Sequence, residues 1–460
     1  MKSLFLFLFL LLPVYGADRP NFIVMLSDDQ DWTGLSVEMH PDVPNSKSDF
    51  FRTPNLERFA SQGIRFSNGY APAPVCSPTR ISLQTGKSPA RLRWTKAAPP
   101  ETGHRLIEAE SRKDIRREEV TVAEMLKGAG YATAHLGKWH LGGGGPEAHG
   151  YDVSDGDTGN RDADPFVDPN PDDVFGMASR AEAFLSRQAA SGTPFYLQLS
   201  WYPLHLPQNA LKLTRAFYEK QPPGRMHQDV DVAAITENLD TGVGQVLDAV
   251  ERLKLADHTY IVYLSDNGAG GGGRGGIRPL SAGKGGVSEG GIRVPFIVRG
   301  PGIPAGSWSH VPVLAYDLFP TFCQLAGVTA SLPPQLDGTD ISSLLHGNPD
   351  GFRRPTGELV FHFPHYQGDT PHSAIRVGNH KLLHFYETGE DRLYDLATDL
   401  GERKDLAPTR PEIVTDLRGR LATYLRDVDA AMPSPNPNFD PAREPARKGG
   451  RNKGKPKPRP

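Results

Sequence analysis

Short apolar runs alternate with longer amphipathic segments along most of this chain, and that alternation restricts its fold more than any other feature. A short, continuous apolar run is typical of a strand that is buried on both faces of a sheet. Such runs are NFIVML, YATAHLG, FYLQLSW, TYIVYLS and VPFIVRG, and helical patterns stand between them near 53–63, 121–130, 174–190 and 230–254. The pattern predicts an α/β fold with a mostly parallel central sheet and helices on both of its faces.

Prolines and glycines mark where the predicted elements begin and end. The segment TPNLERFASQG carries the boundary signals of a helix, with Thr53 as its cap, Pro54 in its first turn and Gly63 as its terminator. The segment APAPVCSPTRISLQTGK, residues 71–87, is interrupted by prolines at three positions, Pro72, Pro74 and Pro78. We expect these prolines to exclude both a core helix and a central strand from that segment.

The pattern changes after Arg354, where short runs separated by turn residues replace the long alternation. The runs ELVFHF, SAIRVGNHKLLHFY and DRLYDL predict a small antiparallel sheet, and a helical pattern follows over 411–428. Because 460 residues exceed what one hydrophobic core usually supports, a smaller C-terminal subdomain is expected. The predicted divisions are a signal peptide (1–16), a catalytic domain (17–352), a C-terminal subdomain (353–432) and a disordered basic tail (433–460).

The N-terminus has the composition of an export signal, since Lys2 precedes the apolar run SLFLFLFLLLPVYG, which is too short to span a membrane. We therefore expect an exported protein, periplasmic or secreted, with no membrane span. Exported proteins often contain disulfides, yet the only cysteines are Cys76 and Cys323. Cys323 is expected to be a small buried hydrophobe, and a bridge between the two stays an alternative. A net charge of −3 gives no reason to expect nucleic acid as a partner.

Polar side chains follow the predicted strands at the points where those strands end. Asp28 and Asp29 follow NFIVML, and Asp266 and Asn267 follow TYIVYLS. Because ligands of doubly wound sheets bind outside the carboxyl ends of the strands, these side chains are expected to share one site. Oxygen donors favour a hard cation, calcium or magnesium, over zinc. For each aspartate taken singly, a helix cap or a solvated turn is the alternative.

Basic side chains stand near the same strand ends. Lys138 and His140 follow YATAHLG, His205 follows FYLQLSWYP, and Lys284 comes after a glycine-rich stretch at 268–276. The lysines could neutralise an anionic substrate, and the histidines could transfer protons near neutral pH. The glycine-rich stretch also has the spacing of a dinucleotide fingerprint, but no amphipathic helix follows it. A flexible loop that carries Lys284 into the site is therefore the preferred interpretation.

Together these motifs resemble the type I sulfatases over most of the chain, from about Arg19 to Leu406. The resemblance rests on CSPTR followed by LQTGK, and on the order of SDDQ, GKWHLG, YPLHLP, SDNG and GKGGVSEGGIRVP around it. In that family the pattern Cys-x-Pro-x-Arg directs oxidation of the cysteine to formylglycine. Thr79 stands where serine is commonest, and LQTGK replaces the commoner LLTGR. The resemblance implies an alkaline-phosphatase-like fold with a smaller C-terminal subdomain.

The resemblance also implies a role for each residue of the predicted site. Cys76 becomes the precursor of formylglycine, made by a formylglycine-generating enzyme that acts on the CSPTR segment. Arg80 supports the modified residue, His140 bonds its hydroxyl, and His205 is the acid for the leaving oxygen. The remaining implied residues are the sulfate-binding Lys138 and Lys284 and the calcium ligands Asp28, Asp29, Asp266, Asn267 and the modified Cys76.

The expected activity is hydrolysis of sulfate monoesters, and the leaving alcohol is expected to be a sugar hydroxyl. The segment HFPHYQGDTPHSAIR places His362, His365 and His372 in the subdomain that is expected to rim the pocket. All three are candidates for sugar contacts, with ordinary surface residues as the alternative, and His365 is the predicted substrate contact. Two alternatives stay open. One is an enzyme of the same fold that prefers phosphate or phosphonate esters. The other is a non-catalytic protein that binds sulfated glycans, although binding alone would not need Cys76.

Overall fold

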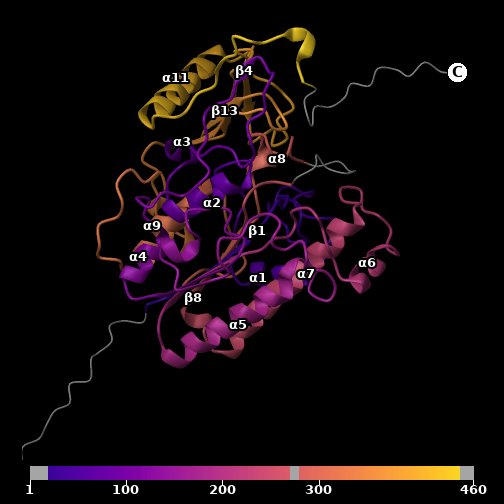
Figure 1. Cartoon of the computed structure of the whole chain (residues 1–460), viewed down its shortest axis with the longest axis vertical. Coiled ribbons are helices and arrows are strands. Elements are labelled where there is room, and N and C mark those ends of the chain that lie inside the picture. The colour runs from indigo at the N-terminus through magenta and orange to yellow at the C-terminus, as the bar shows by residue number, and fades with distance from the viewer. Residues whose placement is uncertain (1–18, 270–278, 446–460) are drawn as a thin grey trace, which may run out of the picture.

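An eight-stranded sheet runs through the centre of the computed structural model, which describes residues 19–269 and 279–445 (Figure 1). Across the sheet the strands are β10 (Ser307–Ser309), β2 (Ile64–Phe66), β9 (Phe296–Arg299), β8 (Thr259–Ser265), β1 (Asn21–Ser27), β7 (Phe195–Ser200), β5 (Ala132–Gly137) and β6 (Val153–Ser154). The run from β8 to β6 is parallel, whereas β9 is antiparallel to both β8 and β2. The prediction of a mostly parallel sheet is confirmed.

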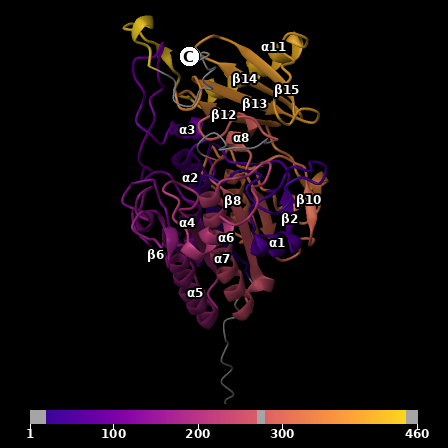
Figure 2. The same cartoon turned by 90° about the vertical axis from the view of Figure 1, so that its right-hand side faces the viewer.

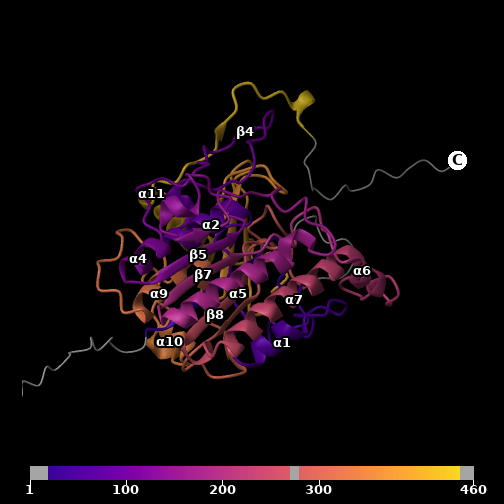
Figure 3. The same ribbon diagram turned by 60° about the horizontal axis from the view of Figure 1, so that its bottom comes forward.

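The central strand β1 is apolar throughout because both faces of the sheet are covered. Ile23 and Met25 pack into the core on one face, and Phe22, Val24 and Leu26 pack into the core on the other. The helices on the first face are α1 (Pro54–Ser61), α5 (Val174–Ser191) and α7 (Val230–Arg252), and Figure 3 shows α5 and α7 side by side across the strands. The helices on the second face are α2 (Cys76–Thr85), α4 (Val122–Gly128), α9 (Leu318–Leu325) and α10 (Ser342–Leu345). Cys323 is buried in α9, as predicted, and both cysteines are free, so they form no bridge.

Helix α2 lies in the segment from which a core helix was expected to be excluded, and that prediction is wrong. All of its 10 residues are buried. Pro78 is the third residue of the helix, where a backbone N–H has no acceptor within the helix, so proline removes no hydrogen bond there. The helix ends at Gly86, whose φ of 68° is left-handed and whose N–H donates to the carbonyl of Ser82.

Helix α1 begins at Pro54 as predicted, but Gly63 is not its terminator. The helix ends at Ser61, and Gly63 lies instead against the backbone of β9, where an added Cβ would stand 2.2 Å from the carbonyl oxygen of Val298. This glycine therefore permits close approach between a loop and a strand. The start of α4 is a capping box, in which Thr121 and Glu124 satisfy each other's backbone N–H groups.

A second sheet, antiparallel throughout, sits on one end of this body (Figure 2). Its strands are β12 (Glu358–Phe363), β13 (His372–Val377), β14 (His380–Phe385) and β15 (Asp391–Asp395). One face packs on the body through a cluster that includes Phe361, Leu383 and Ile292, and α11 (Pro411–Asp427) covers the other face. The predicted C-terminal sheet and helix are confirmed, and the run SAIRVGNHKLLHFY forms two strands joined by a turn.

The remaining described elements are short. Besides short 3-10 helices, they are β3 (Gly69–Tyr70), β11 (Val313–Leu314), α3 (Pro89–Leu92), α6 (Lys212–Tyr218), α8 (Glu289–Ile292), β4 (Leu106–Ile107) and β16 (Ser434–Pro435). Because β16 pairs with β4, the expectation of disorder from residue 433 onward is wrong for this part. The predicted signal peptide, residues 270–278, which include most of the glycine-rich stretch, and residues 446–460 of the basic tail lie outside the described residues. Within the described ranges, no helix is both long and apolar enough to cross a membrane.

Candidate active site

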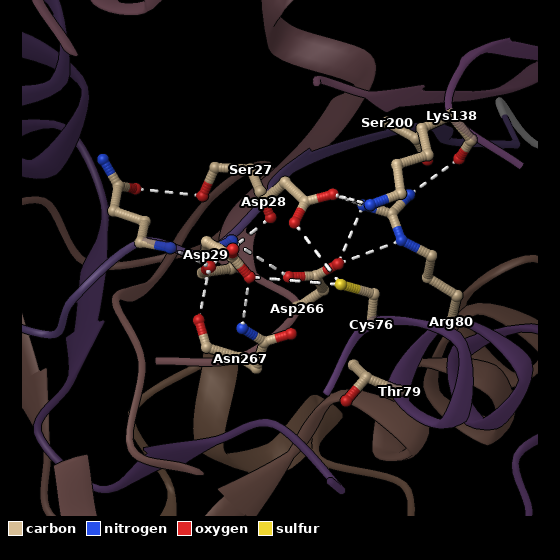
Figure 4. Close-up of polar contacts among 12 residues, drawn as sticks. Ser27, Asp28, Asp29, Cys76, Thr79, Arg80, Lys138, Ser200, Asp266 and Asn267 are labelled. Carbon is tan, nitrogen blue, oxygen red and sulfur yellow. Dashed lines mark hydrogen bonds and ion pairs between the residues drawn. The ribbon is translucent and has the colours of Figure 1, made fainter. Parts of the chain in front are cut away.

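The carboxyl ends of β1 and β8 lie side by side, because these strands pair in register as far as Ser27 and Ser265. Asp28 and Asp29 therefore stand beside Asp266 and Asn267, and α2 brings its first residue, Cys76, to the same place. Figure 4 shows the Cys76 sulfur directed toward the aspartates. The sulfur and one oxygen from each of Asp28, Asp29 and Asp266 lie within 4.8 Å of one another. The structure thus brings together the polar side chains that were expected to share one site because they follow the ends of the strands.

This group fits a hard divalent cation. The three carboxylates are buried, and the amide nitrogen of Asn267 donates to Asp29 Oδ1 at 2.7 Å and to the carbonyl of Gly268 at 2.8 Å. The amide oxygen of Asn267 is buried and has no hydrogen-bond partner among the described residues. A buried acceptor without a partner calls for an explanation, which a cation would give. Asp29 also has a left-handed φ of 56°, a strained conformation that is concentrated at functional sites.

Arg80, one turn after Cys76 on α2, ties the two strand ends together. Its side chain is 2% exposed. Nε donates to Asp266 Oδ2 at 3.0 Å, and Nη2 donates to Asp28 Oδ2 at 3.0 Å. Nη1 donates to the carbonyl of Lys138 at 2.7 Å, which attaches the end of β5 to the same point. Arg80 thus fixes the positions of three loops around the sulfur.

Two lysines approach the aspartates from different sides. Lys138 follows β5 and forms a fully buried ion pair with Asp28. Lys284 comes from the loop after the glycine-rich stretch, and its Nζ lies 2.6 Å from Asp29 Oδ1 and 3.4 Å from Cys76 Sγ. One cationic nitrogen therefore contacts the Cys76 sulfur and the other contacts an aspartate of the same group, where both could neutralise an anionic group bound at residue 76.

The charges of this site act differently on its acidic groups. Burial by itself would raise the pKa of Asp28, but Lys138, Arg80 and Lys284 outweigh it and hold that pKa well below its usual range. Burial, with repulsion from Asp28, raises the pKa of Asp266 to about 6. Burial and the charge of Asp28 also hold the pKa of the Cys76 thiol far above its usual range. The unmodified cysteine is therefore a protonated thiol and a poor nucleophile.

His140 and His205 stand at the edge of the group. Burial, with repulsion from Lys138, lowers the pKa of His140 to about 3, and its Nδ1 is buried without a partner among the described residues. Burial also lowers the pKa of His205, although the charge of Asp28 opposes that shift. His205 Nδ1 donates to the carbonyl of Leu206 at 2.9 Å. Both imidazoles are therefore mainly neutral at pH 7.

Two cavities open beside these residues. The larger, of about 740 Å³, is lined by Ser77, His140, Trp94, Lys96, Asp157 and His365 among others. The smaller, of about 290 Å³, is lined by Asp29, His205, Lys284 and Phe51 among others. Ser77 immediately follows Cys76, and Asp29 contacts Lys284, so each cavity reaches the group of charged residues. Each of the two cavities thus offers space for a substrate next to the charged residues around Cys76.

Of the three histidines that were candidates for sugar contacts, one lies on the wall of a cavity and two do not. His365 lines the larger cavity, but Nδ1 donates to Glu108 at 3.0 Å and Nε2 bonds to Thr95 at 2.7 Å, so both nitrogens are engaged. His362 and His372 are not on the walls of either cavity. His362 and His372 are therefore wrong as candidates for sugar contacts, because both are buried and hydrogen-bonded within the subdomain and its contact with the body.

Sequence reasoning also missed the buried charged residues that hold the loops of the site. Glu108 bonds Lys96 at the other end of the segment 96–108, and it also bonds His365, which joins this segment to the C-terminal subdomain. Glu289 lies inside the motif GKGGVSEGGIRVP, which was used only for Lys284, and its carboxylate is fully buried. Glu289 is the single acidic residue of that motif, and this was the available signal. Glu402 lies in the loop that follows β15, and the sequence around it gives no comparable signal.

Comparisons with known proteins show which family the chain is similar to. Residues 20–328 match the model of the Sulfatase family, and residues 284–427 match the model described as N-sulphoglucosamine sulphohydrolase, C-terminal. Arylsulfatase A of Homo sapiens is 29% identical, with 90% of this chain and 89% of that protein covered. N-acetylgalactosamine-6-sulfatase of Sus scrofa is 32% identical, with 82% of this chain and 73% of that protein covered.

Solved structures show the same fold. The crystal structure of Ps i-CgsB matches 89% of this chain and 93% of its own, at 25% identity and a TM-score of 0.73. A structure in complex with D-glucosamine-2-N,6-O-disulfate matches 89% of this chain and 98% of its own, at 20% identity and a TM-score of 0.68. At that identity the second likeness shows the fold alone.

Proposed function

This chain belongs to the sulfatase family and is a sulfuric ester hydrolase, and we propose that it removes O-sulfate groups from carbohydrates with a formylglycine made from Cys76 and a bound calcium ion. The observation that carries this proposal is the placement of the Cys76 sulfur within 4.8 Å of oxygens from three buried aspartates. Lys284 and Arg80 contact the same group. A protein that only bound sulfated glycans would gain nothing from a buried thiol at this point.

The state of Cys76 explains why a modification is needed. Burial keeps the thiol protonated, so the residue is inert in the form that the ribosome makes. When present, formylglycine supplies a nucleophilic oxygen and a way to release sulfate that a thiol lacks. A formylglycine-generating enzyme would act on the CSPTR segment before folding is complete, because all residues of α2 are buried in the folded chain.

Asp28, Asp29, Asp266 and Asn267 would hold the calcium ion, which supplies stabilisation of negative charge on the transferred group. Magnesium accepts the same oxygen donors and is the alternative cation. The residues of the chain do the rest: Arg80 fixes two of the aspartates, while Lys138 and Lys284 would neutralise the sulfate oxygens beside residue 76. His140, on the wall of the larger cavity, would bond the hydroxyl of the modified residue.

His205 is the proposed acid for the leaving oxygen. Its Nδ1 donates to the carbonyl of Leu206, so the imidazole is held in one orientation. Burial lowers its pKa, but a bound anionic sulfate would raise it, because opposite charge favours the protonated ring. Substrate binding would therefore favour an imidazolium that has taken a proton from solvent and can donate it to the leaving oxygen.

Carbohydrate substrates and export are also proposals. N-acetylgalactosamine-6-sulfatase acts on a sulfated sugar by name, and the larger cavity offers space for a sugar and a few polar side chains, among them Lys96 and Asp157, that could bond its hydroxyls. The basic and apolar N-terminus of the sequence supports export to the periplasm or the medium.

The test is sulfate release from a panel of defined monosulfated saccharides, beside phosphate monoesters of the same alcohols. We expect turnover of at least one sulfated saccharide, a clear preference for sulfate over the matched phosphate, loss of turnover after chelation and recovery with calcium. Binding of the sulfated saccharides without turnover, by protein that carries the modification, would contradict the proposal. Faster turnover of the phosphate esters would replace it with a phosphatase.

A further inference from the structure

The loop that carries Lys284 is anchored by side chains from the C-terminal subdomain. On the side of the body, the N–H of Lys284 donates to the carbonyl of Ala269 at 3.0 Å, and the N–H of Gly285 donates to that of Pro74 at 2.9 Å. On the other side, His372 of β13 accepts from the N–H of Val287 at 3.0 Å. The loop therefore lies between two parts of the fold, and its position depends on both.

Glu402 holds both ends of the segment 281–289. One carboxylate oxygen accepts from the N–H of Glu289 at 2.8 Å and also from the hydroxyl of Ser281. The side chain is 2% exposed. Glu402 itself has a left-handed φ of 51°, which is uncommon for a residue with a side chain. A strained residue with a buried charge that closes a loop points to a function for that loop.

Lys381 on β14 connects the two acids of this anchor. Its Nζ lies 2.8 Å from Glu289 Oε1 and 2.8 Å from Glu402 Oε1, and the Lys381 side chain is fully buried. Arg293 Nε bonds the other oxygen of Glu289 at 2.6 Å. A buried charge that loses its partner is strongly unfavourable, so the members of this network fix one another. The network extends from the sheet of the C-terminal subdomain to the loop.

Lys284, the residue that this loop carries, contacts the reacting centre directly. Lys284 Nζ contacts both carboxylate oxygens of Asp29, at 2.6 and 2.8 Å, and lies 3.4 Å from Cys76 Sγ. Its own loop residues are glycines on both sides, Gly283 and Gly285, which restrict the backbone little. The position of the Lys284 backbone, from which the ammonium group reaches Asp29, therefore depends on the anchors of the loop.

We propose that Glu402, together with Lys381, is a positioning residue that sets Lys284 against the reacting centre, so that the C-terminal subdomain contributes to catalysis through this lysine. The inference rests on the proposed function, because it takes Lys284 as a contact of the sulfate. A shift of about 1 Å in a group that meets the transition state lowers the rate by about 100-fold. Loss of the anchor should therefore be visible in the kinetics of an otherwise folded enzyme.

The test is a double-mutant cycle on kcat/KM, with rates expressed per aldehyde-bearing chain. Glu402→Gln should lower kcat/KM for a sulfate ester by about 10- to 100-fold and weaken inhibition by inorganic sulfate. Lys284→Ala should lower kcat/KM further. In the Lys284→Ala background, Glu402→Gln should change kcat/KM by less than about 2-fold, because residues that act through one another are not additive. Glu390→Gln, an exposed acid of the same subdomain, is the matched control and should leave kcat/KM unchanged.

The outcomes separate the inference from the proposed function. Multiplicative losses in the double variant, or unchanged kcat/KM in folded Glu402→Gln, would overturn the positioning role while leaving the function intact. Full activity of Lys284→Ala would instead remove the sulfate contact itself, and the inference with it. If Glu402→Gln does not fold, Ser281→Ala removes only the hydroxyl contact with Glu402 and should show the same dependence on Lys284, to a smaller extent.

Discussion

At the scale of single residues, the protonation of His205, the proposed acid, depends on the charges around it. Burial lowers the pKa of this imidazole, while the charge of Asp28 opposes the shift. The anionic substrate would favour protonation further. General acid catalysis matters in proportion to how poor the leaving group is, and a sugar alkoxide is a poor one. The contribution of His205 should therefore depend on the alcohol that leaves.

His205→Ala should slow hydrolysis of a sulfated sugar by about 100- to 10,000-fold, and hydrolysis of a nitrophenyl sulfate far less, because a nitrophenolate needs no proton. Initial rates of one variant preparation on both substrates decide the matter. His258→Ala, at an exposed position, is the control and should change neither rate. Equal losses on the two substrates would show that His205 contacts the sulfate instead, and would remove it from the acid role.

At the scale of elements, the close contact of β5 with β7 determines where Lys138 lies. Gly137 ends β5 with a left-handed φ of 89°. A Cβ at this position would stand 2.2 Å from the carbonyl oxygen of Ser200 and 2.4 Å from Met177 Cε. Only glycine allows the chain to pass there and to turn Lys138 toward Asp28.

Gly137→Ala should destabilise the fold by about 1–3 kcal/mol for the backbone strain and by about 1–3 kcal/mol more for the overpacking. Equilibrium denaturation by urea measures the difference in free energy of unfolding. Gly128→Ala in α4 is the control: nothing stands within 4 Å of its added Cβ, and the change should be neutral or stabilising by up to about 1 kcal/mol. A Gly137→Ala protein as stable as the parent would show that the contact relaxes easily.

The elements were largely predictable from the sequence, and the failures have physical causes. β1 and β8 stood out because strands buried on both faces must be apolar throughout, and their ends then located Asp28, Asp29, Asp266 and Asn267. Helix α2 was missed, because a proline is neutral in the first turn and harmful only beyond it. Glu402 was out of reach of sequence reasoning, since its role depends on a contact with Glu289 that only the folded chain creates.

At the scale of the whole molecule, buried histidines couple stability to pH. Burial lowers the pKa of His362 to about 4, while its ring bonds Ser373 and the carbonyl of Ala431. In the unfolded chain the same group titrates at its usual value near 6.5. Below that pH the unfolded state binds more protons than the folded state, so stability is full above pH 6.5 and is lost as the pH falls toward 4. His135, His365 and His372 are also buried with lowered pKa values and act in the same direction.

Each such histidine contributes up to about 1.4 kcal/mol per pH unit to the slope of unfolding free energy over this range. His362→Gln should therefore reduce the slope between pH 6.5 and 4 by up to that amount, whatever its effect on stability at pH 7. Urea denaturation at a series of pH values measures both slopes. An unchanged slope would mean that His362 is already protonated in the folded state.

The most direct test of the sulfatase mechanism concerns residue 76 itself. The protein is produced with and without a formylglycine-generating enzyme, the peptide that spans Cys76 is captured with a hydrazide probe, and mass spectrometry measures its aldehyde fraction beside the sulfatase activity of the same sample. We predict that activity is proportional to the aldehyde fraction and is absent from fully unmodified protein. Full activity in protein whose residue 76 is entirely a free thiol would contradict the mechanism.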